Sequence, residues 1–405
     1  MAVDEAEFAS SYWGQAPLLS TRDHLAAGFE DLFSLEAADE LLSRRGLRTP
    51  FIRIARDGRI VDSARYTGSG GVGAAVRDQV SDDRVLALFL DGHTIVLQGL
   101  HRLWPPLIDL TGALSTELGH PVQVNAYITP SSSTGFSAHY DVHDVFVLQI
   151  AGEKQWRIHE PVHPDPLRNQ PWTDRSGDVA ERAAQPPCID TVLRPGDALY
   201  LPRGYLHEAE ALGGVSVHLT IGVHPVTRYT LVEALTAIAA DEPALRSSLA
   251  VGLDLTDPAD LEDELAATID ALVSRLRRVS PGEVAARLAG RTVDGNRPAP
   301  LGPLAQAAAL SELSAATVLT ARDHLRHALR VDGDELVLVL ADRSLRLPVS
   351  VEKAVRALLD GAPIRVRDLP GLDEADALVL AHRLVREGVA VLEPDPPGSA
   401  GHEPR

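Results

Sequence analysis

The stretch GFSAHYDVHDVFVLQIAGEKQWRIHEP, residues 135–161, decides the interpretation of this sequence. It holds His139 and Asp141 two positions apart, followed directly by the apolar run 144–150. On a strand, residues i and i+2 point to the same face, so both side chains can point into the interior of a barrel. Two imidazoles and one carboxylate form the facial set that leaves open positions on a non-haem Fe(II). To complete such a set, His139 and Asp141 need one further histidine from elsewhere in the sequence.

A second motif, GDALYLPRGYLHEAE at residues 196–210, supplies that histidine. Gly196 and Pro202 mark the two ends of a predicted strand. Gly204 then permits a tight turn directly before His207. The spacing G-x5-P-x-G-x2-H is typical of cupin barrels. We predict that His139, Asp141 and His207 are the catalytic iron ligands.

His-x-Asp occurs a second time, as His163-Pro-Asp165. This copy lies in a Pro-rich segment, residues 163–187, with no strand pattern around it. We interpret it as a chance match in an insertion loop, whose replacement should be nearly silent.

Lysine is scarce, since only Lys154 and Lys353 occur. A dicarboxylate co-substrate such as 2-oxoglutarate chelates iron through its keto-acid end and needs a cation for its far carboxylate. Lys154, fifteen residues after His139, is the natural candidate, and the alternative is an ordinary hairpin lysine. Asn125 and Tyr127, on the preceding strand, could bind the same ligand or could be plain strand residues.

The surrounding sequence predicts an α+β chain of several parts. Residues 123–223 contain short β-rich runs separated by turn residues, which is typical of an antiparallel sandwich or barrel. The first hundred residues read as mixed helix and strand without visible chemistry. Together, residues 1–225 are predicted to be the catalytic domain.

After Pro225 the pattern becomes helical. One helix carries Leu231, Leu235 and Ile238, a second opens at Asp257-Pro258, and a third opens at the capping box that starts at Ser280. The apolar stripes of residues 226–302 suit packing or subunit contact. Residues 303–395 read as helix, strand, strand, helix, helix and strand, which suggests a winged-helix-like domain, with a disordered tail at 396–405.

Composition restricts the class of protein further. A chain of 405 residues, 45% hydrophobic and 23% charged, is expected to form two or three globular units. A net charge of −19 argues against direct nucleic-acid binding. The single Cys188, the lack of a long apolar run and the absence of a signal-peptide pattern predict a cytoplasmic protein without membrane contact.

Six further histidines and the four tryptophans show no spacing that assigns them a role. We interpret them as structural or surface residues: His93, His101, His143, His159, His218, His224, Trp13, Trp104, Trp156 and Trp172.

The motifs together resemble the Jumonji-C (JmjC) oxygenases of the cupin superfamily, within them the ribosomal oxygenases. The likeness runs from FASSYWGQAPLL near the start through NAYITP, both iron motifs and HLTIG to the helical and winged-helix parts. It implies a double-stranded β-helix barrel, iron bound by His139, Asp141 and His207, and 2-oxoglutarate bound by Lys154 and near Tyr127. Gly222 departs from a serine that touches the co-substrate in many members. The resemblance also implies a homodimer formed through the helical block and a winged helix that does not read DNA.

The resulting expectation is an Fe(II)- and 2-oxoglutarate-dependent hydroxylase of a protein side chain, with a ribosomal protein as substrate. Three alternatives stay open: hydroxylation of a peptide natural product or small metabolite, a non-catalytic cupin-type binding protein, and a zinc-type isomerase on the same barrel. The Asp in His-x-Asp favours iron over zinc.

Overall fold

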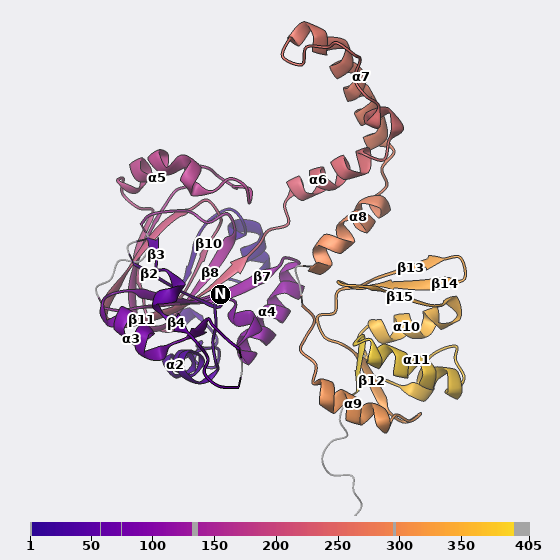
Figure 1. The fold of residues 1–405 in the computed structure, drawn as a ribbon, viewed down its shortest axis with the longest axis horizontal. Coiled ribbons are helices and arrows are strands. Elements are labelled where there is room, and N and C mark those ends of the chain that lie inside the picture. Colours follow the sequence, from indigo (N-terminus) through magenta and orange to yellow (C-terminus); the bar gives the residue numbers. More distant parts are fainter. Residues whose placement is uncertain (1, 57, 74, 132–136, 295–296, 393–405) are drawn as a thin grey trace, which may run out of the picture. The chain divides into compact units, whose positions relative to one another are not determined.

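The computed structural model describes residues 2–56, 58–73, 75–131, 137–294 and 297–392. The chain divides into two compact units, Met1–Pro225 and Val226–Arg405 (Figure 1). No helix in the described ranges is long and apolar enough to cross a membrane. The tail predicted at 396–405 lies outside the described residues.

The first unit is built on a nine-stranded antiparallel sheet, which confirms the predicted antiparallel architecture. Along the sheet the strands are β1 (Leu18–Ser20), β10 (Ala198–Leu201), β8 (Asp144–His159), β11 (Leu206–Val223), β7 (Val122–Thr129), β6 (Thr94–Leu97), β2 (Ile52–Arg56) and β3 (Arg59–Ile60), with β9 (Ile189–Leu193) paired to β8. A separate two-stranded sheet holds β4 (Thr67–Gly68) and β5 (Gln79–Val80).

Two long strands, β8 and β11, replace three shorter β-rich runs of the sequence, and β11 also includes residues 206–212, which were not predicted as a strand. They pair from Leu206 opposite His159 to Val223 opposite Asp144, with a bulge between Leu212 and Val217. Gly152 lies at this bulge with φ of +64°, and a Cβ there would come within 2.2 Å of the carbonyl oxygen of Val215. A bulge shifts the alternation of faces by one residue. Odd-numbered residues of β8 therefore face the interior before Gly152, and even-numbered residues face it afterwards.

Helices cover the outer face of the sheet (Figure 1). They are α2 (Leu35–Arg44), α3 (Asp82–Leu90) and α4 (Pro105–Leu118), with α1 (Glu5–Glu7) at the start and α5 (Ser176–Ala183) inside the predicted insertion loop. Even-numbered residues of β7, such as Val124 and Ala126, are fully buried in the core that these helices share. The odd-numbered residues of β7 are thereby left to face the other side.

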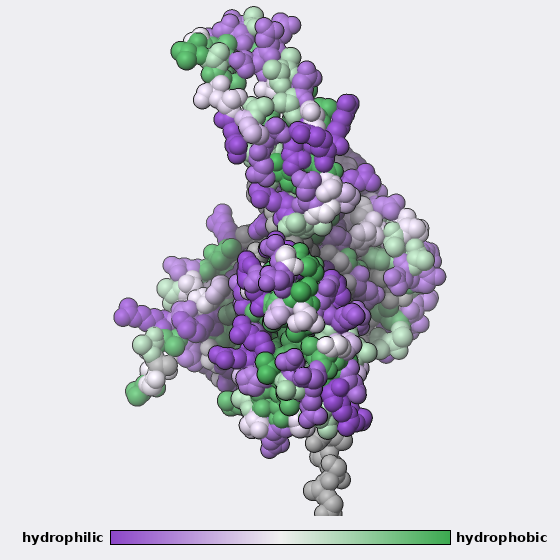
Figure 2. Space-filling view, turned by 90° about the vertical axis from the view of Figure 1, so that its right-hand side faces the viewer, coloured by the Kyte–Doolittle hydropathy of each residue, from purple (hydrophilic) through white to green (hydrophobic). Residues whose placement is uncertain are grey.

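The second unit begins with four helices, α6 (Arg228–Ala239), α7 (Pro258–Arg277), α8 (Pro281–Asp294) and α9 (Pro303–Ser311). Helices α7 and α8 start at the capping residues that the sequence predicts. The Asp257 side chain caps α7, accepting from the Ala259 N–H, and the Ser280 and Glu283 side chains form the capping box of α8. Helix α7 has no buried residue. Figure 2 shows apolar residues scattered among polar ones on its surface, at the top of the view.

The rest of the second unit contains two three-stranded sheets and two helices packed around one core. The sheets are formed by β12 (Val318–Ala321), β16 (Ile364–Arg365) and β17 (Ala390–Leu392), and by β13 (Ala328–Asp332), β14 (Glu335–Val339) and β15 (Ser344–Pro348); the helices are α10 (Glu352–Leu359) and α11 (Glu374–Arg386). The sequence predicts the hairpin β14–β15, both helices and β17, but the short strands β12, β13 and β16 were missed.

Candidate metal centre

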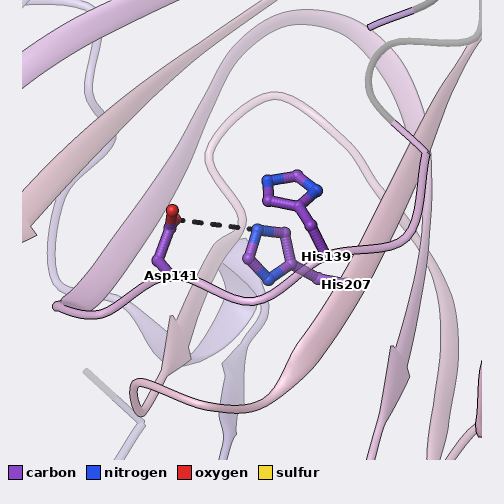
Figure 3. Close-up of side chains that lie close together, drawn as sticks. All are labelled: His139, Asp141 and His207. Atoms are coloured by element: carbon purple, nitrogen blue, oxygen red, sulfur yellow. Dashed lines mark ion pairs between the residues drawn. The ribbon is translucent and has the colours of Figure 1, made fainter. Parts of the chain in front are cut away.

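The structure brings together the three predicted iron ligands. Single ligand atoms of His139, Asp141 and His207 lie within 4.8 Å of one another (Figure 3). The backbones of His139 and His207 pair, with the His207 N–H donating to the His139 carbonyl at 2.8 Å and the reverse bond at 3.2 Å. His139 and Asp141 precede β8, so the prediction that they share a regular strand was wrong. The isolated bridge to β11 fixes His139 instead.

Both imidazoles are oriented by backbone carbonyls. Nδ1 of His139 lies 2.8 Å from the carbonyl oxygen of Ser137, and Nδ1 of His207 lies 3.1 Å from that of Tyr205. A carbonyl can only accept, so each Nδ1 donates and each Nε2 keeps its lone pair. Nε2 of His207 lies 3.8 Å from Oδ2 of Asp141. Metal-binding histidines commonly donate the N–H of the non-ligating ring nitrogen to a backbone carbonyl in this way.

The electrostatics of the site favour the forms that bind a cation. Burial, followed by the nearby charge of His139, lowers the pKa of His207 to about 4. Burial alone would raise the pKa of Asp141, but its electrostatic interactions with His143, His207 and His139 outweigh this effect and leave the pKa below its usual value. At neutral pH the site therefore offers a neutral imidazole and a carboxylate, as metal binding requires.

A cavity of about 250 Å³ adjoins the three ligands. Its lining is drawn from β2, β6, β7, β8 and β11: Arg53, Thr94, Tyr127, Thr129, Val145, Val147, Lys154, Trp156, His207, Glu208, Ala209, His218 and Thr220, with His139, Asp141 and Trp172 completing the wall. The shift of faces at Gly152 is what turns both Val147 and Lys154 inward.

Lys154 is a buried strand residue and not an exposed hairpin lysine. It is 3% exposed, and its Nζ donates to Oγ1 of Thr129 at 3.3 Å. Within the described part of the chain it forms no ion pair. Burial lowers its pKa to about 7. A cation held in this way is prepared for a carboxylate supplied by a ligand.

The other two predicted co-substrate residues differ in position. Tyr127 lines the cavity, and its ring stacks on His218 with centroids 5.0 Å apart. Burial raises the pKa of Tyr127, which keeps its hydroxyl protonated. Asn125 accepts a hydrogen bond from the Gly99 N–H at 3.0 Å, and it is not among the described residues that line the cavity. This hydrogen bond of Asn125 to the Gly99 backbone has a structural role.

Sequence reasoning missed several lining residues. His218, interpreted as structural, is 3% exposed, and its ring lies edge-on to Trp156 at 5.4 Å. Among the described residues, Nδ1 of His218 and Nε1 of Trp156 have no hydrogen-bond partner. Arg53 comes from the first hundred residues, where no chemistry was predicted. The sequence feature that could have indicated Arg53 is its position between two isoleucines, Ile52 and Ile54, which are both buried on β2.

Gly222 lies directly beside the ring of His143. A Cβ on Gly222 would lie 2.8 Å from Cδ2 of His143, whose ring stacks on His224 at 5.1 Å. The position at which the resemblance led us to expect a serine is therefore filled by His143, which the sequence did not single out. A serine here would require His143 to move.

The second His-x-Asp copy is engaged elsewhere. Asp165 pairs with Arg203 at 2.8 Å, and Nε2 of His163 lies 3.1 Å from Oε1 of Gln170. Among the described residues, only His139, Asp141 and His207 form a group able to hold a metal.

Comparisons with known proteins agree with this geometry. Residues 109–231 match the family model of the JmjC domain. Ribosomal oxygenase 2 of Rattus norvegicus is 31% identical over 283 residues, covering 66% of this chain and 57% of the relative. The bifunctional lysine-specific demethylase and histidyl-hydroxylase NO66 of Drosophila persimilis is 37% identical over 248 residues, covering 58% and 33%. The chain thus spans about a third to just over half of these relatives' length.

Among solved structures, the Escherichia coli ribosomal oxygenase YcfD in complex with cobalt and 2-oxoglutarate has a TM-score of 0.55 at 18% identity, over 97% of this chain and 99% of that one. This likeness shows the shared fold, with its mixed α and β content, and confirms the cupin-type architecture expected from the motifs. The chain therefore resembles the JmjC-domain proteins through residues 109–231 and is similar in sequence to the ribosomal oxygenases.

Proposed function

We propose that this protein is an Fe(II)- and 2-oxoglutarate-dependent oxygenase that hydroxylates a side chain of a ribosomal protein. The observation that carries the proposal is the meeting of His139, Asp141 and His207 at a cavity that also contains the buried cation Lys154.

The residues fit the metal. Two imidazoles and one carboxylate converge, and because both Nδ1 atoms are used by backbone carbonyls, each histidine would offer its Nε2 to the ion. Bound Fe(II) would supply the activation of O₂, with oxidative decarboxylation of 2-oxoglutarate to succinate and CO₂ and insertion of one oxygen atom into a substrate C–H bond. The chain's own part is to hold the ligands, bind the co-substrate and limit water.

The residues also fit 2-oxoglutarate. Lys154 offers a charge to the far carboxylate. Nδ1 of His218 and the indole N–H of Trp156, which lack partners among the described residues, are available for further hydrogen bonds. A cavity of about 250 Å³ suits a small dicarboxylate. We therefore assign the co-substrate roles to Lys154 and Tyr127 and propose none for Asn125.

The substrate class rests on the relatives. Similar proteins are named ribosomal oxygenases, and one is named a histidyl-hydroxylase. A ribosomal protein is also basic, which matches the net charge of −19. Hydroxylation of a peptide natural product or small metabolite is the alternative with the same chemistry. The ligand triad together with Lys154 argues against a non-catalytic binding protein.

We propose further that the protein is a homodimer formed through the helical block 226–302. Helix α7 exposes Leu265, Ile269 and Val273 by 56%, 49% and 40%. A 20-residue helix with no buried side chain gains little stability alone. A partner subunit would cover this apolar stripe. Residues 303–395 would form a winged-helix domain that does not bind DNA, and the protein would act in the cytoplasm.

Succinate release tests the function. The full chain, given Fe(II), 2-oxoglutarate and ribosomes from a strain lacking this protein, should release succinate and add one oxygen atom to a ribosomal protein, measured by mass spectrometry. Asp141→Ala should do neither. Succinate release with a small metabolite but not with ribosomes would favour the alternative substrate, and its absence with every substrate would favour a binding protein.

A further inference from the structure

A groove of about 760 Å³ lies between α2 and α3, two helices that run next to each other in the first unit (Figure 1). Its floor includes Ile95 and Ile128 from the sheet. Because β7 alternates its faces, Ile128 lies toward the groove while Tyr127 and Thr129 line the metal cavity. The groove is thus separated from the metal centre by the thickness of the sheet.

Exposed apolar side chains gather at this groove. Leu35, Leu86 and Val215 line it and are 39%, 57% and 36% exposed. Leu90, one helical turn after Leu86, is 76% exposed. Single exposed leucines are ordinary, but a cluster around a concave apolar floor marks a surface that binds another chain.

The rim of the groove is acidic. Four carboxylates line it against a single guanidinium: Glu36, Asp39, Glu40 and Asp82 against Arg44. Arg45 pairs with Glu40, which still leaves an excess of negative charge. An occupant must therefore combine apolar side chains for the floor with positive charges for the rim.

We propose that this groove docks a cationic amphipathic helix of a partner protein, with apolar residues on one face and Lys or Arg on the other. Helix α2 has ten residues, so the groove beside it is about 15 Å long and accommodates roughly three helical turns. The chain's own last residues, EPDPPGSAGHEPR, carry three acidic residues and no large apolar side chain, and therefore do not match. The inference does not depend on the reaction at the metal centre.

The test uses a fluorescein-labelled helical peptide of about 11 residues, three turns, with leucines on one face and arginines on the other. Its binding to the full chain is followed by fluorescence anisotropy. Leu86→Ser removes an exposed apolar contact without changing charge. Glu36→Lys combined with Asp39→Lys reverses the rim. Each is expected to weaken binding about tenfold or more, which corresponds to about 1.4 kcal/mol.

A matched control separates docking from general attraction to an acidic protein. Glu5→Lys with Glu7→Lys makes the same change in net charge on the exposed α1, whose neighbour Phe8 packs beside β1 at the other edge of the sheet. This control should bind the peptide within about twofold of the wild type. A peptide with glutamates in place of arginines should not bind.

Equal affinity in the wild type and both groove variants would overturn the proposal. So would a change of oligomeric state in Leu86→Ser, measured by light scattering, because the groove would then be a subunit contact. Iron content should be the same in all these variants, so a failure of the metal assignment would be seen separately.

Discussion

Lys154 is the residue whose replacement separates co-substrate binding from metal binding. A hydrogen bond from a buried ammonium to a carboxylate contributes about 1.5 to 3 kcal/mol, so Lys154→Ala should weaken 2-oxoglutarate binding about ten- to a hundredfold. Iron content should barely change. Isothermal titration with 2-oxoglutarate measures this, and Lys353→Ala, at the exposed second lysine, is the control. Unchanged affinity in Lys154→Ala would move the role to another cation, with Arg53 in the cavity lining the first to examine.

The pKa of Lys154 also determines how co-substrate binding should vary with pH. In the free protein the pKa of Lys154 is about 7, and a bound carboxylate stabilises the charged form. Below pH 7 the Lys154 side chain is already protonated. Above pH 7 it must take up a proton when 2-oxoglutarate binds. The dissociation constant should therefore rise from about pH 7 upward, by at most about tenfold per pH unit. A flat profile across pH 6 to 9 in the wild type, or the same slope in Lys154→Ala, would contradict this.

At the residue scale, local motifs were enough to identify three residues that the structure brings together as candidate metal ligands. The spacing around His139 and the turn before His207 are each contained in a short stretch of sequence. His218 and Arg53 reach the cavity through strand pairing across long sequence separations, and no local pattern marks them. The same holds for His143, whose role beside Gly222 follows only from the register of β11.

At the scale of elements, Gly152 determines which residues of β8 face the cavity. Gly152→Ala would combine a φ of +64° with a Cβ 2.2 Å from the Val215 carbonyl oxygen. We expect a loss of stability of about 2 kcal/mol or more, together with weaker 2-oxoglutarate binding because Lys154 is displaced. Gly46→Ala is the control, since its φ is +60° with nothing within 4 Å of a Cβ. Urea unfolding and co-substrate titration should show a larger effect for Gly152→Ala, and equal effects would refute the role of the bulge.

The bulge also explains which elements could be predicted. Strand composition and turn residues identified the β-rich region and the capped helices, because those signals are local. Gly152 suggested a turn, so β8 was predicted as two separate runs. The first half of β11, before Gly213 and Gly214, was not predicted as a strand. Only pairing between the two strands shows that both continue through their glycines.

At the scale of the whole molecule, the proposed dimer predicts that α7 forms the contact. Leu265→Glu with Ile269→Glu would place charges in its apolar stripe and should convert a dimer to a monomer at micromolar concentration, measured by light scattering. Ala267→Glu with Ser274→Glu adds the same charges to the opposite face and should leave the dimer intact. A wild-type monomer, or equal effects of both variants, would contradict the proposal. The sequence indicated the apolar stripe but could not identify its partner.

We propose above all that His139, Asp141 and His207 hold an Fe(II) ion that 2-oxoglutarate chelates. Anaerobic titration of the full chain with Fe(II) and then 2-oxoglutarate tests this without knowledge of the substrate, because chelation by a 2-oxo acid produces a visible charge-transfer absorption. We predict that the band appears at one equivalent of iron in the wild type, persists in His163→Ala and is lost in Asp141→Ala. A wild-type protein that binds iron without developing the band, or an Asp141→Ala variant that develops it fully, would contradict the account.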